Sequence, residues 1–365
     1  MRVTPTGVFN DKGRTGGIQP APLLWRKTEA CARSYSLAWV WFQMIQRARK
    51  MFVTFLLIRS QIAQVDKHMS TTQQVRATAT GARTQDEFFG SKSEPGIGPV
   101  ERTLGSATLR WPEYVMEGAL LGLFMISACV FSIIFQLPRS PVRQAISSAE
   151  LRRVLTGIAM GLTAIALIYS PWGQRSGAHF NPSVTLTFLR LGKIKRVDAS
   201  FYLLFQFAGA AIGVFVAAMI LGTRICDASV QYAATYPGTS GAAVAALGEF
   251  AISFLQMTII LTVSNHPRFN RLTGIVAGLM VATYIAIESP YSGMSMNPAR
   301  TFGSALPSGI WNGFLIYLLV PPVAMLAAAQ VFVWRKGSSA VHCCKLDHSP
   351  KRDCIFCGMK GTTHE

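Results

Sequence analysis

Six long apolar stretches, separated by short polar segments, dominate the chain after residue 110. Each has about 20 residues or slightly more, the length that an α-helix needs to cross a hydrocarbon core of roughly 30 Å. Across their central parts the only ionisable residues are Glu117 and Glu249. The pattern predicts an all-α membrane protein. We place its spans at about 113–135, 152–171, 199–221, 242–264, 272–289 and 310–334.

The six spans form two copies of one pattern: a span with one Glu, a second span, a loop with Asn-Pro, and a third span. The first copy contains Glu117 and the motif Asn181-Pro182-Ser183, and the second contains Glu249 and the motif Asn297-Pro298-Ala299. Because each copy has three spans, the two copies must enter the membrane in opposite orientations. We therefore expect two inverted repeats, at about 111–221 and 242–334.

Each Asn-Pro motif is followed by a short apolar segment, 184–191 in the first copy and 301–306 in the second. Neither segment is long enough to cross a membrane alone. Pro costs no hydrogen bond at the first helical position and Asn is a good cap, so both motifs predict re-entrant half-helices. The irregular backbone before them is stable at membrane depth only where it is buried in protein or lines a wet cavity. We expect the two half-helices to meet tip to tip at the midplane.

Glycines recur four residues apart in four of the spans, a spacing that lets helix backbones approach closely. One such pair has little weight, because Gly is common in membrane helices, but four pairs favour tight packing. The pairs are Gly118/Gly122, Gly157/Gly161, Gly209/Gly213 and Gly274/Gly278.

Composition agrees with this picture, since 50% of the residues are hydrophobic, 14% are charged and the mean hydropathy is +0.32. About half of the net charge of +18 comes from scattered Arg and Lys in the first 110 residues, outside any nucleic-acid motif, so it predicts a basic membrane flank and no nucleic-acid partner. We divide the chain into an extension without packed structure at 1–110, a membrane domain at 111–337 and a tail at 338–365.

The extension contains one apolar run, at 36–57, but Gln46, Arg47, Arg49 and Lys50 interrupt it, so we do not expect a span there. It also lacks the layout of a signal peptide. A plainer polar lead-in begins at Met69, which raises the hypothesis that residues 1–68 come from an over-extended start site.

Basic residues predict the orientation, because cytoplasmic loops are enriched in Lys and Arg. The segment between spans two and three, the one between spans four and five and the end of span six would be cytoplasmic, with both termini inside. Four arginines near the first loop oppose this orientation. The supporting residues are Arg190, Lys193, Lys195, Arg196, Arg268, Arg271, Arg335 and Lys336, and the opposing ones are Arg139, Arg143, Arg152 and Arg153.

The segments 176–185 (SGAHFNPSVT) and 292–305 (SGMSMNPARTFGSA) resemble the paired signature loops of the aquaporin, or major intrinsic protein, family. The resemblance covers about residues 112–337, and two such motifs at this spacing are specific, whereas one Asn-Pro is usually a turn or a cap. It implies six transmembrane helices plus two re-entrant half-helices in two inverted repeats. The implied function is a passive channel for water or small neutral solutes that excludes protons and ions.

The resemblance also implies the setting. We expect a homotetramer with one pore per subunit in the bilayer of a plasma or inner membrane, with no cofactor required.

The resemblance assigns roles to individual residues. The amides of Asn181 and Asn297 would donate hydrogen bonds to solutes at the midplane. Arg300 matches the selectivity-filter arginine of the family, although an Arg near a membrane edge is often an interfacial anchor. Glu117 and Glu249 would accept hydrogen bonds from the backbone of the two signature loops. We expect His179 to line the pore or to support its loop, since a solitary His does not indicate a metal site.

The remaining filter positions follow by counting along the chain from the motifs. They are Ile285 in the fifth span, Met294 in the second loop and either Met160 or Gly161 in the second span, because one residue is inserted near Pro171. Such an aliphatic filter would admit glycerol, ammonia or hydrogen peroxide beside water. Thr301, however, stands where glycerol facilitators of the family typically carry Asp, so the range of solutes stays open.

Four of the seven cysteines lie in the last 25 residues and not in an evenly spaced disulfide framework, which indicates a reduced, cytosolic tail. Cys344, His348, Cys354 and Cys357 supply four ligands of the types that zinc favours, and His342 and Cys343 are spare. Their spacing differs from the commonest zinc fingers. The alternatives are a redox-active or palmitoylated cluster and an inert tail.

Two other function classes compete with the channel. A coupled secondary transporter also uses inverted repeats and broken helices, but it needs a titratable or ion-binding group at the midplane, where this chain offers neutral amides. A membrane-tethered metal or redox sensor would act through the tail. The sequence contains no phosphate-binding Gly loop and no catalytic triad, so we do not expect an enzyme.

Overall fold

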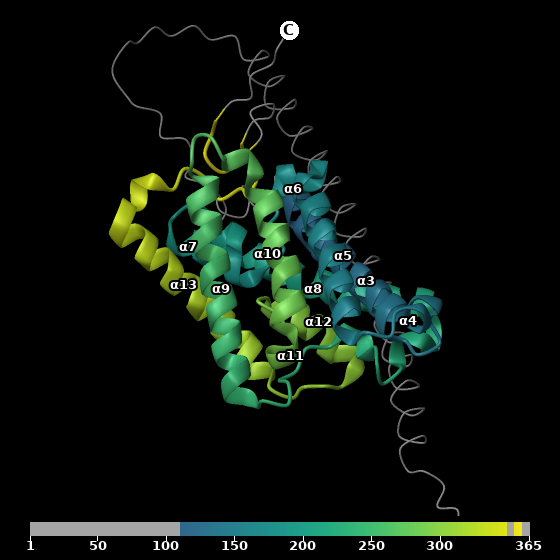
Figure 1. Ribbon diagram of the computed structural model, residues 1–365. Coiled ribbons are helices and arrows are strands. Elements are labelled where there is room, and N and C mark those ends of the chain that lie inside the picture. The colour runs from purple at the N-terminus through teal and green to yellow at the C-terminus, as the bar shows by residue number, and fades with distance from the viewer. Residues whose placement is uncertain (1–109, 349–353, 360–365) are drawn as a thin grey trace, which may run out of the picture.

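The computed structural model describes residues 110–348 and 354–359 (Figure 1). The predictions for the N-terminal extension, including the hypothesis about its start site, concern residues outside this part of the chain. Over the described residues the fold is all-α, with six helices of membrane-spanning length, as predicted. The predicted fold class is therefore confirmed.

The helices follow the order of the two sequence repeats. The first repeat contains α3 (Trp111–Gln136), α5 (Ala149–Tyr169), the half-helix α7 (Pro182–Arg190) and α8 (Arg196–Leu221). The second contains α9 (Ala242–Ser264), α10 (Thr273–Ile287), the half-helix α12 (Pro298–Ser308) and α13 (Phe314–Lys336). Short helices are α4 (Pro141–Ala145), α6 (Pro171–Ser176) and α11 (Ser289–Ser292), and 3₁₀ turns lie at Gly222–Cys226, Gln231–Ala233, Asn270–Leu272 and Ser338–Ala340.

The spans at 152–171 and 272–289 were predicted to run two residues further than their helices do. The structure ends α5 at Tyr169, and Ser170 then takes an extended backbone and caps α6, its hydroxyl accepting a hydrogen bond from the Gly173 N–H at 3.0 Å. The following Pro171 disfavours a helical backbone at Ser170, so the chain breaks there. At the matching place of the second repeat, α10 ends at Ile287 and the short α11 follows.

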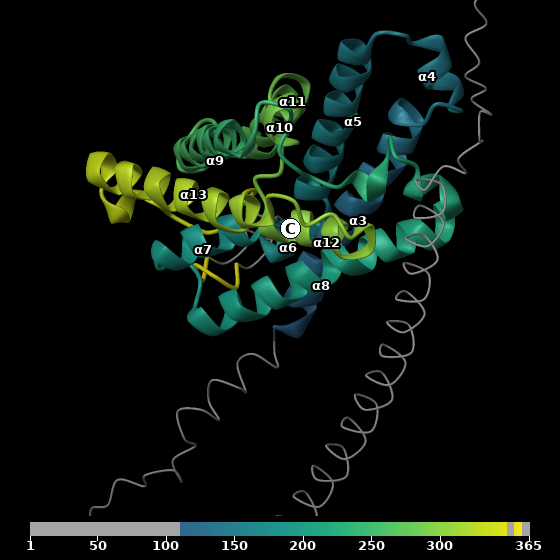
Figure 2. The same cartoon turned by 90° about the horizontal axis from the view of Figure 1, so that it is seen from below.

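The half-helices form the centre of the molecule. The helix α7 packs on α8 and α13, and α12 packs on the same two long helices and on α7. Figure 2 shows both half-helices between the first-repeat helices on one side and α9, α10 and α13 on the other. In Figure 1, α6 lies at the upper end of the bundle and α11 at the lower end, so the two loops enter from opposite sides.

The four glycine pairs lie in two helix contacts. Gly118 and Gly122 of α3 face Gly209 and Gly213 of α8, so closely that a Cβ on either α8 glycine would collide with a backbone carbonyl of α3. Gly157 and Gly161 of α5 meet α10 in the same way, at Ala282 and Gly278. Glycine is required here because the two backbones touch.

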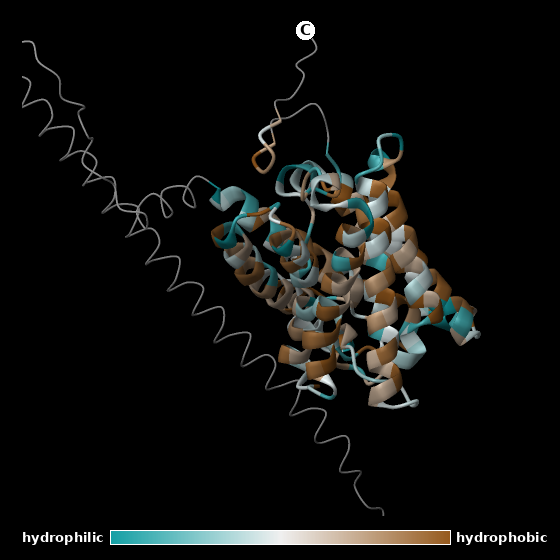
Figure 3. Ribbon diagram, turned by 90° about the vertical axis from the view of Figure 1, so that its left-hand side faces the viewer, coloured by the Kyte–Doolittle hydropathy of each residue, from teal (hydrophilic) through white to brown (hydrophobic). Residues whose placement is uncertain are grey.

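The outward face of the long helices is apolar. Figure 3 shows hydrophobic residues along the middle of the bundle and hydrophilic ones toward its two ends. Large side chains on this face include Leu204, Ile220, Leu247 and Leu315, each more than 60% exposed. Such a surface is stable in a lipid bilayer, so the chain is a multi-pass membrane protein.

We predict that Gly209→Val lowers the stability of the detergent-solubilised protein by about 1–3 kcal/mol or more, because a side chain there collides with the backbone carbonyl of Gly118 at the α3–α8 contact. Thermal unfolding followed by size-exclusion chromatography measures this effect. The matched control is Leu204→Val on the lipid-facing side of the same helix, which should change stability by about 0.5 kcal/mol or less. Equal losses in both variants would contradict the packing account.

Candidate functional site

The loops before the two half-helices share an unusual backbone. Ala178 and Phe180 have φ values of 56° and 26°, and Met294 and Met296 have φ values of 51° and 54°. These are left-handed conformations that residues other than glycine rarely adopt. They occur at the same two positions before each Asn, so both loops are bent in the same way and need contacts to hold them.

Glu117 and Glu249 supply these contacts from buried positions in the first helix of each repeat. Glu117 accepts hydrogen bonds from the backbone N–H groups of His179 at 3.0 Å and Phe180 at 2.6 Å. Glu249 accepts from the N–H groups of Ser295 at 2.6 Å and Met296 at 2.8 Å. A carboxylate is a strong acceptor, so each acid holds two N–H groups that the bent loop leaves without a helical partner.

Serine and tyrosine side chains complete each support. The hydroxyls of Ser176 and Ser292 donate to Glu117 at 2.8 Å and to Glu249 at 3.0 Å. The carbonyls of the same two serines accept from the buried hydroxyls of Tyr202 and Tyr317. The two halves of the molecule therefore repeat one network.

The amides of Asn181 and Asn297 connect the two halves. Each side-chain oxygen caps its own half-helix, that of Asn181 through Ser183 N at 2.8 Å and that of Asn297 through Ala299 N at 3.1 Å. Each Nδ2 donates to a carbonyl of the opposite loop, Asn181 to Met296 O and Asn297 to Phe180 O, both at 2.8 Å. An amide has two N–H hydrogens, so one remains for a solute.

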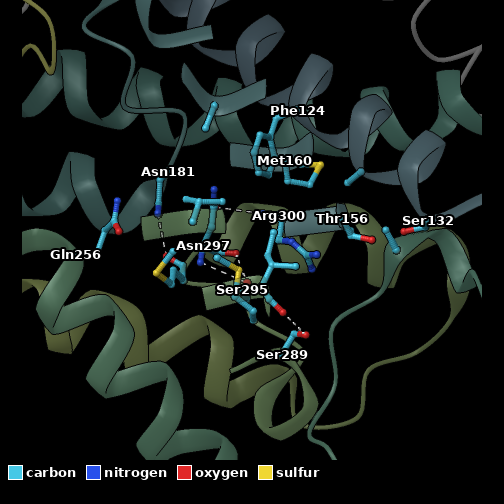
Figure 4. A pocket seen from close by; sticks show the side chains of 18 of the residues that line it. Phe124, Ser132, Thr156, Met160, Asn181, Gln256, Ser289, Ser295, Asn297 and Arg300 are labelled. Atoms are coloured by element: carbon cyan, nitrogen blue, oxygen red, sulfur yellow. Dashed lines mark hydrogen bonds between the residues drawn. The ribbon is translucent and has the colours of Figure 1, made fainter. Parts of the chain in front are cut away.

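A cavity of about 440 Å³ passes this meeting point. In Figure 4 the labelled lining residues run from Gln256 through Asn181 and Asn297 to Arg300, and then to Thr156 and Ser132. On the Gln256 side the lining is mainly apolar and includes Ile260. Among the described residues that line this cavity there is no carboxylate.

Comparisons with known proteins agree with this geometry. The sequence pattern of the family described as Major intrinsic protein matches residues 114–332, which is more than half of the chain. The chain belongs to the major intrinsic protein family. This finding confirms the family resemblance drawn from the two Asn-Pro loops.

Relatives of the chain include plant members of this family. It is 33% identical over 178 residues to a probable aquaporin NIP-type of Nicotiana alata, a match over 48% of this chain and 63% of the relative. It is 29% identical over 273 residues to aquaporin NIP2-2 of Zea mays, a match over 72% of this chain and 90% of the relative. The chain thus spans about three fifths of the first relative.

A solved structure shares the fold. The X-ray structure of the aquaglyceroporin from Plasmodium falciparum superposes with a TM-score of 0.51, at 20% identity, over 60% of this chain and 94% of the other. At this identity the likeness concerns the arrangement of helices.

Four expected filter residues of this major intrinsic protein line the cavity together, namely Met160, Ile285, Met294 and Arg300. Arg300 follows Asn297 on α12, and its backbone N–H donates to Asn297 Oδ1 at 3.2 Å. Its Nη1 is buried and has no hydrogen-bond partner. A passing solute can accept from this nitrogen.

Gly161, the alternative to Met160, is not at the cavity. It faces Gly278 on α10, where two helix backbones touch, so its assignment to the filter is corrected. Met160 lies one position earlier and therefore about 100° around the helix, which turns its side chain inward.

Several lining residues were absent from the sequence prediction. Thr156 lies one helical turn before Met160, and Gln256 lies two turns after Glu249, so helical spacing could have found both. Phe124, whose ring lies 6.0 Å from that of Phe180, gave no comparable signal because α3 carries apolar residues on all sides.

His179 holds the tail to its loop. Its Nε2 donates to the Cys344 carbonyl at 2.8 Å, and its Nδ1 lies 3.1 Å from Thr185 Oγ1. The Leu346 N–H donates to the Gly177 carbonyl at 3.1 Å, and Leu346 itself lines the cavity. The tail residues 341–348, hereafter the docked segment, thus lie against one mouth of the cavity.

Polar side chains fix the docked segment to α6. Lys345 Nζ donates to the Gln174 carbonyl at 2.9 Å, and Gln174 Nε2 donates to the Asp347 carboxylate at 3.0 Å. Burial raises the pKa of the Asp347 carboxyl, and the hydrogen bond from Gln174 acts against that shift.

The tail ligand set predicted from sequence needs one correction. The structure brings together Cys343, His348, Cys354 and Cys357, and not Cys344. Cys344 is fully buried at the loop of His179, which donates to its carbonyl. The Sγ atom of the adjacent Cys343 lies 3.6 Å from Cys354 Sγ, so Cys343 takes the place in the cluster.

We predict that Glu117→Gln destabilises the protein by several kcal/mol, because an amide has one acceptor oxygen and leaves at least one buried loop N–H unpaired, at about 1–3 kcal/mol for each lost partner. Thermal unfolding of the purified protein measures this loss. The control is Glu150→Gln at an exposed position on α5, which should unfold like the wild type. A wild-type unfolding temperature for Glu117→Gln would show that the loop does not depend on the carboxylate.

Proposed function

We propose that the protein is a passive transmembrane channel for water and other small uncharged solutes. The observation that carries this proposal is the pair of neutral amides, Asn181 and Asn297, that meet on the wall of a membrane-depth cavity. Membership of the major intrinsic protein family supports it. No bond is made or broken in this function, so the chain is not proposed as an enzyme.

Charge exclusion follows from the two half-helices. The N-termini of α7 and α12 face the same point, and the partial positive charge of each raises the energy of a cation there. The Asn amides donate hydrogen bonds to a passing water, whose oxygen then turns toward them. A water oriented in this way interrupts the file of hydrogen-bonded waters along which a proton would be transferred. Arg300 adds a full positive charge beside this point.

The filter supports a range of solutes wider than water. Met160, Ile285 and Met294 offer aliphatic or thioether surface opposite the Arg300 guanidinium. A solute with an apolar edge and a polar edge, such as glycerol, fits such a wall, and ammonia and hydrogen peroxide are small enough to pass. We propose these three beside water.

A coupled transporter is the weaker alternative. Glu117 and Glu249 are occupied by loop N–H groups, and no Asp or Glu is among the described residues that line the cavity. An ion-coupled mechanism needs a group that takes up and releases the ion in the transport path. The neutral amides at the crossing favour passive flux.

The setting is also part of the proposal. Basic residues at the end of α7 and in the last turn of α13 support an orientation with both termini on the cytoplasmic side, and the docked segment would then lie on that side. By family membership the protein is proposed to be a homotetramer in the plasma or inner membrane, with one pore in each subunit.

We predict that proteoliposomes with the wild-type chain shrink in an osmotic gradient without any ion gradient, and that Asn297→Leu lowers this water flux at least about tenfold. The substitution leaves the Phe180 carbonyl and two α12 N–H groups unpaired at the meeting point of the two loops. Stopped-flow light scattering measures the flux. The control is Asn312→Ala in an exposed loop. Flux that requires an ion gradient would support the transporter.

We predict that Ile285→His lowers glycerol flux more than water flux, because a polar ring that reaches further from the backbone than Ile narrows the filter and removes the apolar surface for the carbon chain. The ratio of the two permeabilities on one preparation measures this. Ile285→Leu conserves volume and polarity and should keep the wild-type ratio. An unchanged ratio for Ile285→His would exclude Ile285 from the filter.

A further inference from the structure

Four side chains of the tail bring their ligand atoms together outside the bundle. The Sγ atoms of Cys343, Cys354 and Cys357 and a ring nitrogen of His348 all lie within 4.8 Å of one another. Cys343 Sγ is 3.6 Å from Cys354 Sγ, and His348 Nε2 is 3.1 Å from Cys357 Sγ. Cys343 and Cys344 of the docked segment are free thiols. Cys354 and Cys357, in the turn at residues 354–359 (hereafter the tail turn), are free thiols as well.

These distances suit a tetrahedral metal. Zinc bonds of about 2.3 Å to sulfur and about 2.0–2.1 Å to nitrogen place two sulfurs about 3.8 Å apart, and a sulfur and a nitrogen about 3.6 Å apart. Both measured pairs are within about 0.5 Å of that geometry. Three thiolates and one imidazole are a donor set for structural zinc.

The local backbone presents the ligands together. Cys354 and Cys357 belong to a tight turn, closed by hydrogen bonds from Gly358 N to Cys354 O at 3.0 Å and from Cys354 N to Met359 O at 2.8 Å. Cys343 and His348 belong to the docked segment, with four residues between them. A solvent-accessible cavity lined by Cys343, His348 and Cys357 gives a metal a route to the cluster.

The cluster is connected to the pore through the docked segment. Cys343 is followed by Cys344, whose carbonyl accepts from His179, and by Leu346, which is 4% exposed and lines the pore cavity. On the other side of the cluster, Phe356 packs edge-on against Tyr202, with ring centroids 6.2 Å apart. Any group that ties Cys343 and His348 to the tail turn therefore fixes Leu346 in place.

We propose that the tail binds one Zn²⁺ through Cys343, His348, Cys354 and Cys357, and that the bound metal holds Leu346 across the mouth of the pore. Binding displaces the thiol protons to solvent and forms three Zn–S bonds and one Zn–N bond. When the metal leaves, the segment from His342 to Asp347 keeps its hydrogen bonds and its buried apolar contacts with the bundle but loses its tie to residues 354–359, so it detaches from the mouth of the pore more readily. The zinc site stands alone, whereas the occlusion rests on the channel function proposed above.

The first experiment measures metal content in the full-length chain, purified in detergent under reducing conditions and equilibrated with Zn²⁺. We expect about one zinc per chain in the wild type and in Cys344→Ser, and a loss of most of it in Cys343→Ser. Replacement of zinc by Co²⁺ should give thiolate-to-cobalt absorption in the first two proteins. Absence of bound zinc, equal loss in both variants, or a Cys343–Cys354 disulfide in the reduced protein would overturn the site.

The second experiment compares water flux of proteoliposomes with zinc bound and after removal by a strong chelator. We expect that removal of zinc makes water flux several-fold faster in the wild type. In Cys343→Ser we expect fast water flux both with and without the chelator. The Leu346→Gly variant should retain zinc and show fast water flux in both states, since the substitution removes only the side chain that closes the mouth of the pore.

The outcomes separate the two proposals. If the wild-type protein gives equally fast water flux with zinc bound and after its removal, the proposed occlusion is wrong and the proposed channel function is unaffected. If the zinc-free wild type and Leu346→Gly both give water flux no faster than that of protein-free vesicles, the proposed channel function is wrong. The proposed occlusion then fails with it. Metal content then continues to report on the zinc site, because it does not depend on transport.

Discussion

The structure depends on the burial of two carboxylates against two irregular loops. A backbone that leaves the helical path at membrane depth exposes N–H groups that no lipid can satisfy, so each loop needs an acceptor from within the protein. Glu117 and Glu249 provide it from the first helix of each repeat, and the left-handed residues beside them would not persist without that support. The half-helices, their amides and the cavity wall all follow from where those two acids hold the chain.

The same constraint explains the reciprocal amide bonds. Once both loops are bent, the carbonyls of Phe180 and Met296 point toward the opposite half of the molecule, and each accepts from the Asn of the other loop. The two inverted repeats are therefore tied at the wall of the cavity. At this crossing the wall presents neutral amides, which suits the proposed passage of uncharged molecules.

Much of this could be predicted from the sequence. Span lengths, the repeat and the capped half-helices depend on local pattern, and the two buried acids were evident because no other ionisable residue lies in the central parts of the spans. The features that could not be predicted depend on the rotation of a helix about its axis and on contacts between residues far apart in the sequence. The choice between Met160 and Gly161 could be made only once the start of α6 was known. The amide bonds between the loops could be recognised only from the relative position of the two halves. The replacement of Cys344 by Cys343 in the cluster needed the direction in which the docked segment runs over His179.

The central claim is a preformed neutral pathway through the meeting point of the two loops. The temperature dependence of osmotic water permeability, measured in zinc-chelated proteoliposomes, tests it most directly, because water crossing a lipid bilayer must leave its hydrogen bonds and water in a lined pore need not. The account predicts a lower activation energy than in protein-free vesicles, with no accompanying proton current. An activation energy equal to that of the bare bilayer, or a proton current that rises with water flux, would contradict it.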